Sequence, residues 1–110
     1  MLDLKPKHLS ILLAIIEQHV PDSEVWAYGS RVEGHSHAGS DLDLVLRNPD
    51  DLTRLQPKLW ELKEAISASN LPILVDVMDW ARVPEHFKQE ILRSHVVLRK
   101  GTIPTDVLEK

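Results

Sequence analysis

Two aspartates two positions apart, Asp41 and Asp43, are the residues of this 110-residue chain whose types and spacing most clearly suggest chemistry. The segment 41–47 places leucines on one face and both aspartates on the other, which is the periodicity of a strand. The two carboxylates would then lie about 6.6 Å apart along that face. Such a pair can hold a hard cation such as Mg²⁺, although Asp-x-Asp alone is also found in capped turns and on solvated strand faces.

A glycine–serine pair upstream strengthens this interpretation. Gly29 and Ser30 follow a short strand, 24–29, and open a brief helical turn, where peptide N–H groups and the helix dipole favour an anion. Glycine lets a phosphate approach the main chain, serine adds a hydroxyl donor, and Arg31 adds charge-assisted contacts. Taken alone, the pair is more typical of a tight strand-to-helix turn. Together with Asp-x-Asp ten residues further on, it predicts phosphates and metal ions held at one site.

A third carboxylate is available on a later strand, expected at 73–78. Asp76 lies in the middle of that strand between apolar neighbours, where burying a carboxylate without a partner is costly. On a strand beside the Asp41 segment, and on the same face, it would complete a cage of three carboxylates. Asp79 at the end of the strand is the weaker candidate and is expected to cap the turn before Pro84.

Helices and strands alternate around these residues. Apolar spacing predicts a first helix beginning at Pro6 and a second helical stripe over 52–66, kinked or restarted at Pro57. Pro84 begins a last helix, and 95–100 is a further strand candidate. The order predicts an α/β (α+β) fold with helices on a small mixed sheet, and three strands look too few to be buried on both faces.

The tryptophans and two of the histidines are further candidates for binding a substrate or a metal. Trp26 and Trp60 are expected in the core, whereas Trp80, just after the third strand, is expected to line a substrate cleft. His35 and His37 could bind a transition metal, but without a third ligand they are expected to be surface histidines.

Composition sets limits on the function. The length predicts one domain, and the absence of cysteine excludes disulfides and thiolate metal sites. The net charge of −4 argues against sequence-independent binding of nucleic acid, and all of the excess negative charge falls in residues 1–50, which hold the aspartate pair. Without a leader or a long apolar run, the chain is expected to be cytoplasmic and not anchored to a membrane.

At this point the sequence resembles the minimal nucleotidyltransferases of the polymerase-β superfamily. The resemblance rests on V-W-A-Y-G-S-R-x-x-G at 25–34, S-D-L-D-L at 40–44 and V-D-V-M-D-W at 75–80. It implies a nucleotidyltransferase domain over 1–100 with a tail at 101–110. Such enzymes transfer a nucleoside monophosphate, usually AMP, from a nucleoside triphosphate to an acceptor hydroxyl, with Mg²⁺ and two ions expected. Glu33 departs from the small or basic residue usual before the second glycine, which puts the grip on the triphosphate in doubt.

The resemblance also assigns roles residue by residue. Gly29 and Ser30 match the turn that binds the triphosphate, and Arg31 is expected to grip the same phosphates. Asp41 and Asp43 match the metal ligands. The third carboxylate, which assists the acceptor hydroxyl, falls on Asp76 and is expected to complete the metal site.

The acceptor is expected to lie outside this chain. Larger relatives carry a helical bundle that binds substrate, so the resemblance implies a separate helical partner. That partner is either a substrate-binding subunit or a HEPN-type RNase toxin modified with AMP on a tyrosine. The apolar face of residues 9–20 is compatible with docking it. Two alternatives stay open, an antitoxin that acts by binding alone and a small-molecule adenylyltransferase, as does a homo-oligomer.

Overall fold

Helices and strands alternate along the chain in the computed structural model, which describes residues 2–37 and 39–100. The elements are α1 (Pro6–His19), β1 (Glu24–Tyr28), α2 (Ser30–Glu33), β2 (Leu42–Arg47), α3 (Leu59–Ser67), β3 (Val75–Asp79), the 3₁₀ helix η1 (Trp80–Arg82), α4 (Glu85–Arg93) and β4 (Val96–Arg99). The predicted tail at 101–110 lies outside the described residues.

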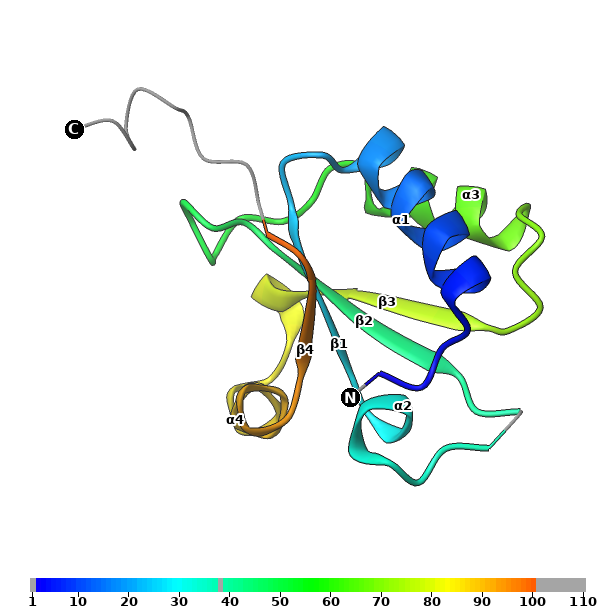
Figure 1. The fold of residues 1–110 in the computed structure, drawn as a ribbon. Helices are drawn as coiled ribbons and strands as arrows, with labels where there is room; N and C mark the ends of the chain where they lie inside the picture. The colour runs from blue at the N-terminus through cyan, green and yellow to red at the C-terminus, as the bar shows by residue number, and fades with distance from the viewer. Residues whose placement is uncertain (1, 38, 101–110) are drawn as a thin grey trace, which may run out of the picture.

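The strands form one mixed sheet in the order β3-β2-β1-β4. β1 pairs antiparallel with β2 on one side and with β4 on the other, while β2 and β3 run parallel. A parallel pair needs a crossover, and α3 supplies it between β2 and β3 (Figure 1). The expected class, helices on a small mixed sheet, is confirmed.

Both faces of the sheet carry a hydrophobic core. On one face α1 and α3 bury Leu12 and Leu62, both without solvent exposure, against the strands. On the other, α4 and η1 pack Ile91 and Trp80 against Trp26, and Figure 1 shows α4 on the side of the sheet opposite α1 and α3. The expectation that the sheet has too few strands to be buried on both faces is therefore wrong, because β4 widens the sheet and α4 folds back beneath it.

The helices follow the apolar pattern except in the second stripe. α1 begins at Pro6, as predicted, whereas α3 begins only at Leu59. The preceding segment is a turn in which the Asp51 carboxylate accepts hydrogen bonds from the N–H and the hydroxyl of Thr53, at 3.0 and 2.6 Å. These local bonds compete with a helix, and Leu52 is consequently exposed. None of the helices in the described part of the chain is long and apolar enough to cross a bilayer.

The three tryptophans divide differently from the expectation. Trp26 is buried, as predicted. Trp60 is 70% exposed, because α3 turns Leu62 and Ile66 toward the sheet and a residue two positions before Leu62 points the other way. Trp80 does not line a cleft: it is buried against Trp26, with ring centroids 5.6 Å apart in an edge-on arrangement.

A pair of substitutions in α3 tests this assignment of faces. Leu62→Ala is expected to lower the free energy of unfolding by about 2–5 kcal/mol, because it leaves a cavity in the core. Trp60→Ala is expected to change it by no more than about 0.5 kcal/mol, because the ring is exposed. Urea denaturation measures both, and a larger loss for Trp60→Ala would contradict the orientation of the helix.

Candidate active site

Pairing across three strands places Tyr28, Asp43 and Asp76 in one row. Tyr28 of β1 is the register partner of Asp43 of β2, and Asp43 is the register partner of Asp76 of β3. Register partners project from the same face of a sheet, and here that is the face carrying Trp26 and α4. The sequence placed Asp43 and Asp76 on one face of adjacent strands, and this is confirmed.

Asp41 lies one residue before β2. The strand begins with Leu42, whose N–H donates to the carbonyl of Leu74 at 2.9 Å, and this bond joins the segment carrying Asp41 to the approach to β3. Asp41 and Asp76 are both exposed, whereas Asp43 between them is half-buried. The three carboxylates are therefore reachable from solvent on one side.

The carboxyl of Asp43 lies in unfavourable surroundings for a negative charge. Burial raises its pKa above the ordinary value, and the charges of Asp76 and then Asp41 raise it further. Like charges held together in this way are relieved by a bound cation. Carboxylate oxygens are the ligands that Mg²⁺ prefers, so the residues present fit a divalent metal.

Tyr28 completes the polar row as a neutral group. Burial raises the pKa of its hydroxyl to about 12, with the charges of Asp43 and Asp76 as further causes. The hydroxyl therefore stays protonated at neutral pH, and it donates to the sulfur of Met78 at 3.5 Å. Its role next to the carboxylates is that of a neutral, largely apolar wall.

The turn after β1 is fitted closely to Asp43. Gly29 has φ +85°, a left-handed conformation that other residues adopt only with strain. A Cβ built on Gly29 would collide with Oδ2 of Asp43. Glycine is thus required on two grounds, and the absence of a side chain lets the main chain of this turn lie against the carboxylate of Asp43. Ser30 follows directly as the first residue of α2.

The side chain of Arg31 bonds to backbone carbonyls and does not extend into solvent. Its side chain is buried, with Nε donating to the carbonyl of Ser40 and Nη1 to the carbonyl of Asp3, both at 2.9 Å. It therefore fixes the residue immediately before Asp41 and ties it to the N-terminal segment. The predicted contact of Arg31 with phosphates stays a prediction, and no pattern in the sequence indicated this positioning role.

Asp76 and Asp79 exchange the environments that the sequence suggested. Asp76 is exposed, whereas Asp79 is buried on the opposite face, where it pairs in register with Leu46. Burial raises the pKa of Asp79, and its Oδ1 accepts the N–H of Gln56 at 3.2 Å. The expectation of a turn cap before Pro84 is thus replaced by a cap on the turn before α3. Asp76 lies opposite Asp43 because of the pairing of β2 with β3, and not because its own side chain is buried.

Metal ligation by all three carboxylates stays a prediction. Within residues 2–37 and 39–100, no three acidic or imidazole side chains form a ready-made cluster around one point. The register supplies the pair Asp43 and Asp76, and Asp41 stands beside it on a less constrained segment. Of the two loop histidines, His35 bonds to the Glu33 carboxylate at 3.0 Å, and both are exposed, as expected.

A cavity of about 310 Å³ opens beside the row. Its lining includes Tyr28, Gly29 and Asp43 from the sheet side and Phe87 and Glu90 from α4. The ring of Phe87 stands edge-on to that of Tyr28, with centroids 5.7 Å apart. The sequence pattern identified Phe87 only as an apolar residue of the last helix, and nothing in its spacing reveals that α4 returns to the glycine turn.

Known proteins resemble this chain over most of its length. Residues 9–100 match the family model described as nucleotidyltransferase domain. A relative from Haemophilus influenzae, described as probable protein adenylyltransferase MntA, is 43% identical over 99 residues, which cover 90% of this chain and 85% of the relative.

Solved structures share the fold. One described as a toxin-antitoxin with AMP-PNP matches with a TM-score of 0.66 and 25% identity, over 91% of this chain and 78% of that one. Another, described as the toxin-antitoxin MntA-HepT, matches with a TM-score of 0.61 and 21% identity, over 94% and 79%. The polymerase-β-type fold implied by the sequence motifs is therefore confirmed.

The two left-handed glycines form a matched pair for testing the fit of the turn. Gly34 has φ +90° with nothing within 4 Å of an added Cβ, so Gly34→Ala is expected to cost about 1–2 kcal/mol of unfolding free energy from backbone strain alone. Gly29→Ala is expected to cost at least about 1 kcal/mol more, because the methyl group displaces Asp43. Urea denaturation compares them, and equal losses would show that the carboxylate does not crowd the turn.

Replacing the Arg31 fork with a single ammonium tests its positioning role. Arg31→Lys is expected to lower the free energy of unfolding by about 1–3 kcal/mol, because one ammonium nitrogen replaces the two nitrogens, Nε and Nη1, that bond the Ser40 and Asp3 carbonyls in a planar fork. The exposed Arg54 offers a control, and Arg54→Lys is expected to change stability by less than about 0.5 kcal/mol. Unchanged stability in both variants would leave Arg31 without this role.

Proposed function

Because the chain belongs to the nucleotidyltransferase domain family, we propose that it transfers AMP from ATP to a hydroxyl group of a separate protein. The observation that carries this proposal is the register of β2 with β3, which sets Asp43 opposite Asp76 directly beside the Gly29 turn. The Haemophilus relative, described as a probable protein adenylyltransferase, supports the choice of both the transferred group and the kind of acceptor.

The turn and the aspartates divide the work of binding the nucleotide. Gly29 and Ser30 hold the triphosphate at the start of α2, with Arg31 adding positive charge behind them. Asp41 and Asp43 would hold two Mg²⁺ ions, and these ions would supply positive charge against the phosphates and the leaving pyrophosphate. The raised pKa of Asp43 supports this role, because burial first and then the charges of Asp76 and Asp41 disfavour its negative form, and a bound cation would favour that form.

Asp76 acts on the acceptor. It is exposed at the outer strand of the sheet, so a hydroxyl carried by another protein can reach its carboxylate from solvent. Asp76 orients the hydroxyl and takes its proton as the acceptor oxygen bonds to the α-phosphorus. The bond from that phosphorus to pyrophosphate breaks in line with the attack. The residues contribute chiefly by positioning and by neutralising charge.

The surface around Asp76 suits a protein acceptor better than a small molecule. Leu74, two positions before Asp76, is 74% exposed and would add an apolar contact to a protein docked over this edge. On α1, by contrast, Leu12 and Ile16 are fully buried against the sheet, which leaves less of that helix for docking than the sequence suggested. We therefore place the helical partner, a HEPN-type toxin or substrate-binding subunit, over the β3 edge.

Two neighbouring aspartates on opposite faces provide the test. With a co-purified partner encoded beside this chain, labelled ATP and Mg²⁺, Asp76→Asn is expected to reduce transfer of label by at least about 100-fold. Asp79→Asn, on the other face, is expected to change transfer by less than about threefold, because the amide oxygen can still accept the Gln56 N–H. Asp43→Asn is expected to match Asp76→Asn.

The same experiment separates catalysis from simple binding. If the chain neutralised its partner by contact alone, no label would appear and partner inhibition would be the same in Asp41→Asn, Asp76→Asn and the unchanged chain. Label that enters a small molecule in place of the partner would instead favour the small-molecule adenylyltransferase. Omitting Mg²⁺ or adding EDTA is expected to abolish transfer and leave complex formation intact.

A further inference from the structure

Apolar side chains gather at the surface around the start of α3. Trp60 is 70% exposed and Leu55 is 43% exposed. Together with Pro57 and Leu59 they line a cavity of about 470 Å³. Tryptophan is among the residue types most enriched at the positions that dominate the binding energy of protein interfaces. A large ring left in water beside further apolar side chains therefore indicates a contact surface.

Two cations, Lys63 of α3 and Arg82 of η1, line the same cavity. Within residues 2–37 and 39–100 neither of them forms an ion pair. Asp79 lies beneath them, 4% exposed, with its Oδ1 accepting the N–H of Gln56 at 3.2 Å. Burial raises the pKa of Asp79, while the Gln56 bond and the charges of Arg82 and Lys63 act to lower it. Two cations thus stand over one buried carboxylate, and the exposed part of the cavity is positive.

We call Leu55, Trp60, Lys63 and Arg82 the Trp60 surface. It lies at the same edge of the sheet as Asp76, because Asp79 of the cavity wall ends β3, the outermost strand. The two aspartates project from opposite faces, with Asp79 on the face that α3 covers. A protein that reaches Asp76 over the β3 edge is therefore also within reach of the Trp60 surface.

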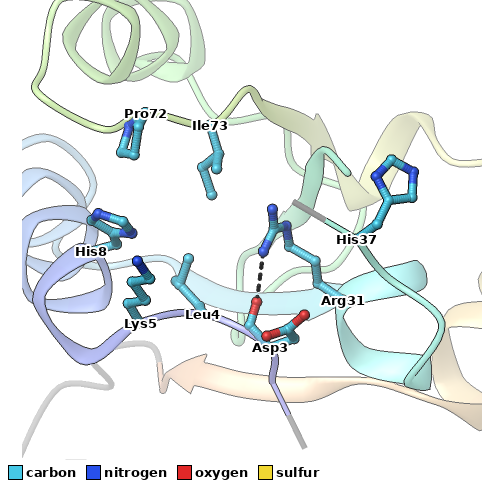
Figure 2. A pocket seen from close by; sticks show the side chains of 8 residues that line it. All are labelled: Asp3, Leu4, Lys5, His8, Arg31, His37, Pro72 and Ile73. Atoms are coloured by element: carbon cyan, nitrogen blue, oxygen red, sulfur yellow. Dashed lines mark hydrogen bonds between the residues drawn. The ribbon is translucent and has the colours of Figure 1, made fainter. Parts of the chain in front are cut away.

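Another cavity away from the carboxylate row, of about 330 Å³, has a different character (Figure 2). Arg31 in its wall bonds to the carbonyl of Asp3, and this wall thus ties the N-terminal segment to α2 within the chain. At the Trp60 surface, by contrast, both the tryptophan ring and Arg82 are exposed. Of the two cavities, this is the one that presents its side chains to another molecule.

The charge of the Trp60 surface indicates what covers it. A second copy of this chain, paired through the same surface about a two-fold axis, would bring Lys63 and Arg82 against identical cations. A different protein that offers an apolar side chain between carboxylates would contact the tryptophan ring and both cations at once. The complementary partner is therefore an acidic surface with an apolar centre.

We propose that the Trp60 surface docks the protein that receives AMP, and that this protein contributes an apolar side chain flanked by carboxylates. The choice of partner rests on the proposed function. Because the surface shares an edge of the sheet with Asp76, docking there holds the acceptor hydroxyl close to that carboxylate. The Trp60 surface contributes affinity, and the chemistry stays with the aspartates.

Isothermal titration calorimetry of the full chain against the full-length partner encoded beside it tests the proposal. Trp60→Ala is expected to weaken the complex at least about tenfold, the effect typical of truncating an interface anchor. Leu55→Ala is expected to weaken it at least about threefold. Leu92→Ala is the matched control, because Leu92 is 44% exposed but lies on α4, on the other side of the sheet, and a change of less than about twofold is expected.

Charge reversal tests the chemistry of the partner. Arg82→Glu is expected to weaken the complex at least about tenfold, because it sets a carboxylate against carboxylates. Arg93→Glu, on the exposed side of α4, is expected to change the affinity less than about twofold. The affinity of the unchanged chain is expected to fall as NaCl is added, because salt screens the attraction between exposed charges.

Transfer of labelled AMP separates this inference from the proposed function. Raising the partner concentration is expected to restore transfer in Trp60→Ala but not in Asp76→Asn, since the first change weakens docking and the second removes the group that acts on the acceptor. If the affinities follow the expectation and even the unchanged chain transfers no label, the proposed function fails and the docking surface stands.

Three results would overturn the docking surface. These are an unchanged affinity in Trp60→Ala, equal losses in Leu55→Ala and Leu92→Ala, or self-association of the chain alone that Trp60→Ala abolishes. The last result, seen by analytical ultracentrifugation, would assign the surface to a second copy of this chain. Circular dichroism of each variant checks that the fold is retained.

Discussion

The sheet holds the carboxylates of Asp43 and Asp76 next to each other against their electrostatic repulsion, and the rest of the structure must supply the stability that offsets it. Their strands are adjacent and parallel, and the register sets the two residues directly opposite each other. The raised pKa of Asp43 records both its partial burial and the nearby negative charge. An arrangement of this kind persists only because the surrounding structure over-determines it. A divalent cation held by these carboxylates would relieve the same repulsion.

The hydrophobic core supplies that over-determination. Leu42 and Leu44, on either side of Asp43, are fully buried beneath α1 and α3. A slip of one residue in the pairing would bring Asp43 into this apolar core and send the leucines to the other face. Val77 next to Asp76 is buried in the same way. The position of the carboxylates thus follows from the burial of their neighbours. The same alternation of apolar residues and aspartates sets both the geometry of the candidate active site and the stability of the sheet.

How much could be foreseen depended on whether a residue's setting was local. Spacing along the chain predicts the Gly29 turn, the strand of Asp43 and the face of the strand from which Asp76 projects. The structure agrees with all three. Trp60 and the segment before α3 were misjudged because an apolar pattern does not reveal the turn around Asp51, nor which side of a helix meets the sheet. The environments of Asp76 and Asp79 depend on strand order, which no local pattern contains.

Arg31 shows how one side chain joins regions that are distant in sequence. Its backbone continues the turn of Gly29 and Ser30, while its guanidinium bonds to the carbonyls of Ser40 and Asp3. The loop that carries Asp41 is therefore anchored by the residue that follows the turn of Gly29 and Ser30. Ten residues lie between Ser30 and Asp41, and the first three of them belong to α2. The loop that follows needs such a clamp to hold a carboxylate in place, because closing and ordering it costs conformational entropy. The glycine–serine turn and the Asp-x-Asp segment, which are separate in the sequence, are thus held together in the folded chain by the side chain of Arg31.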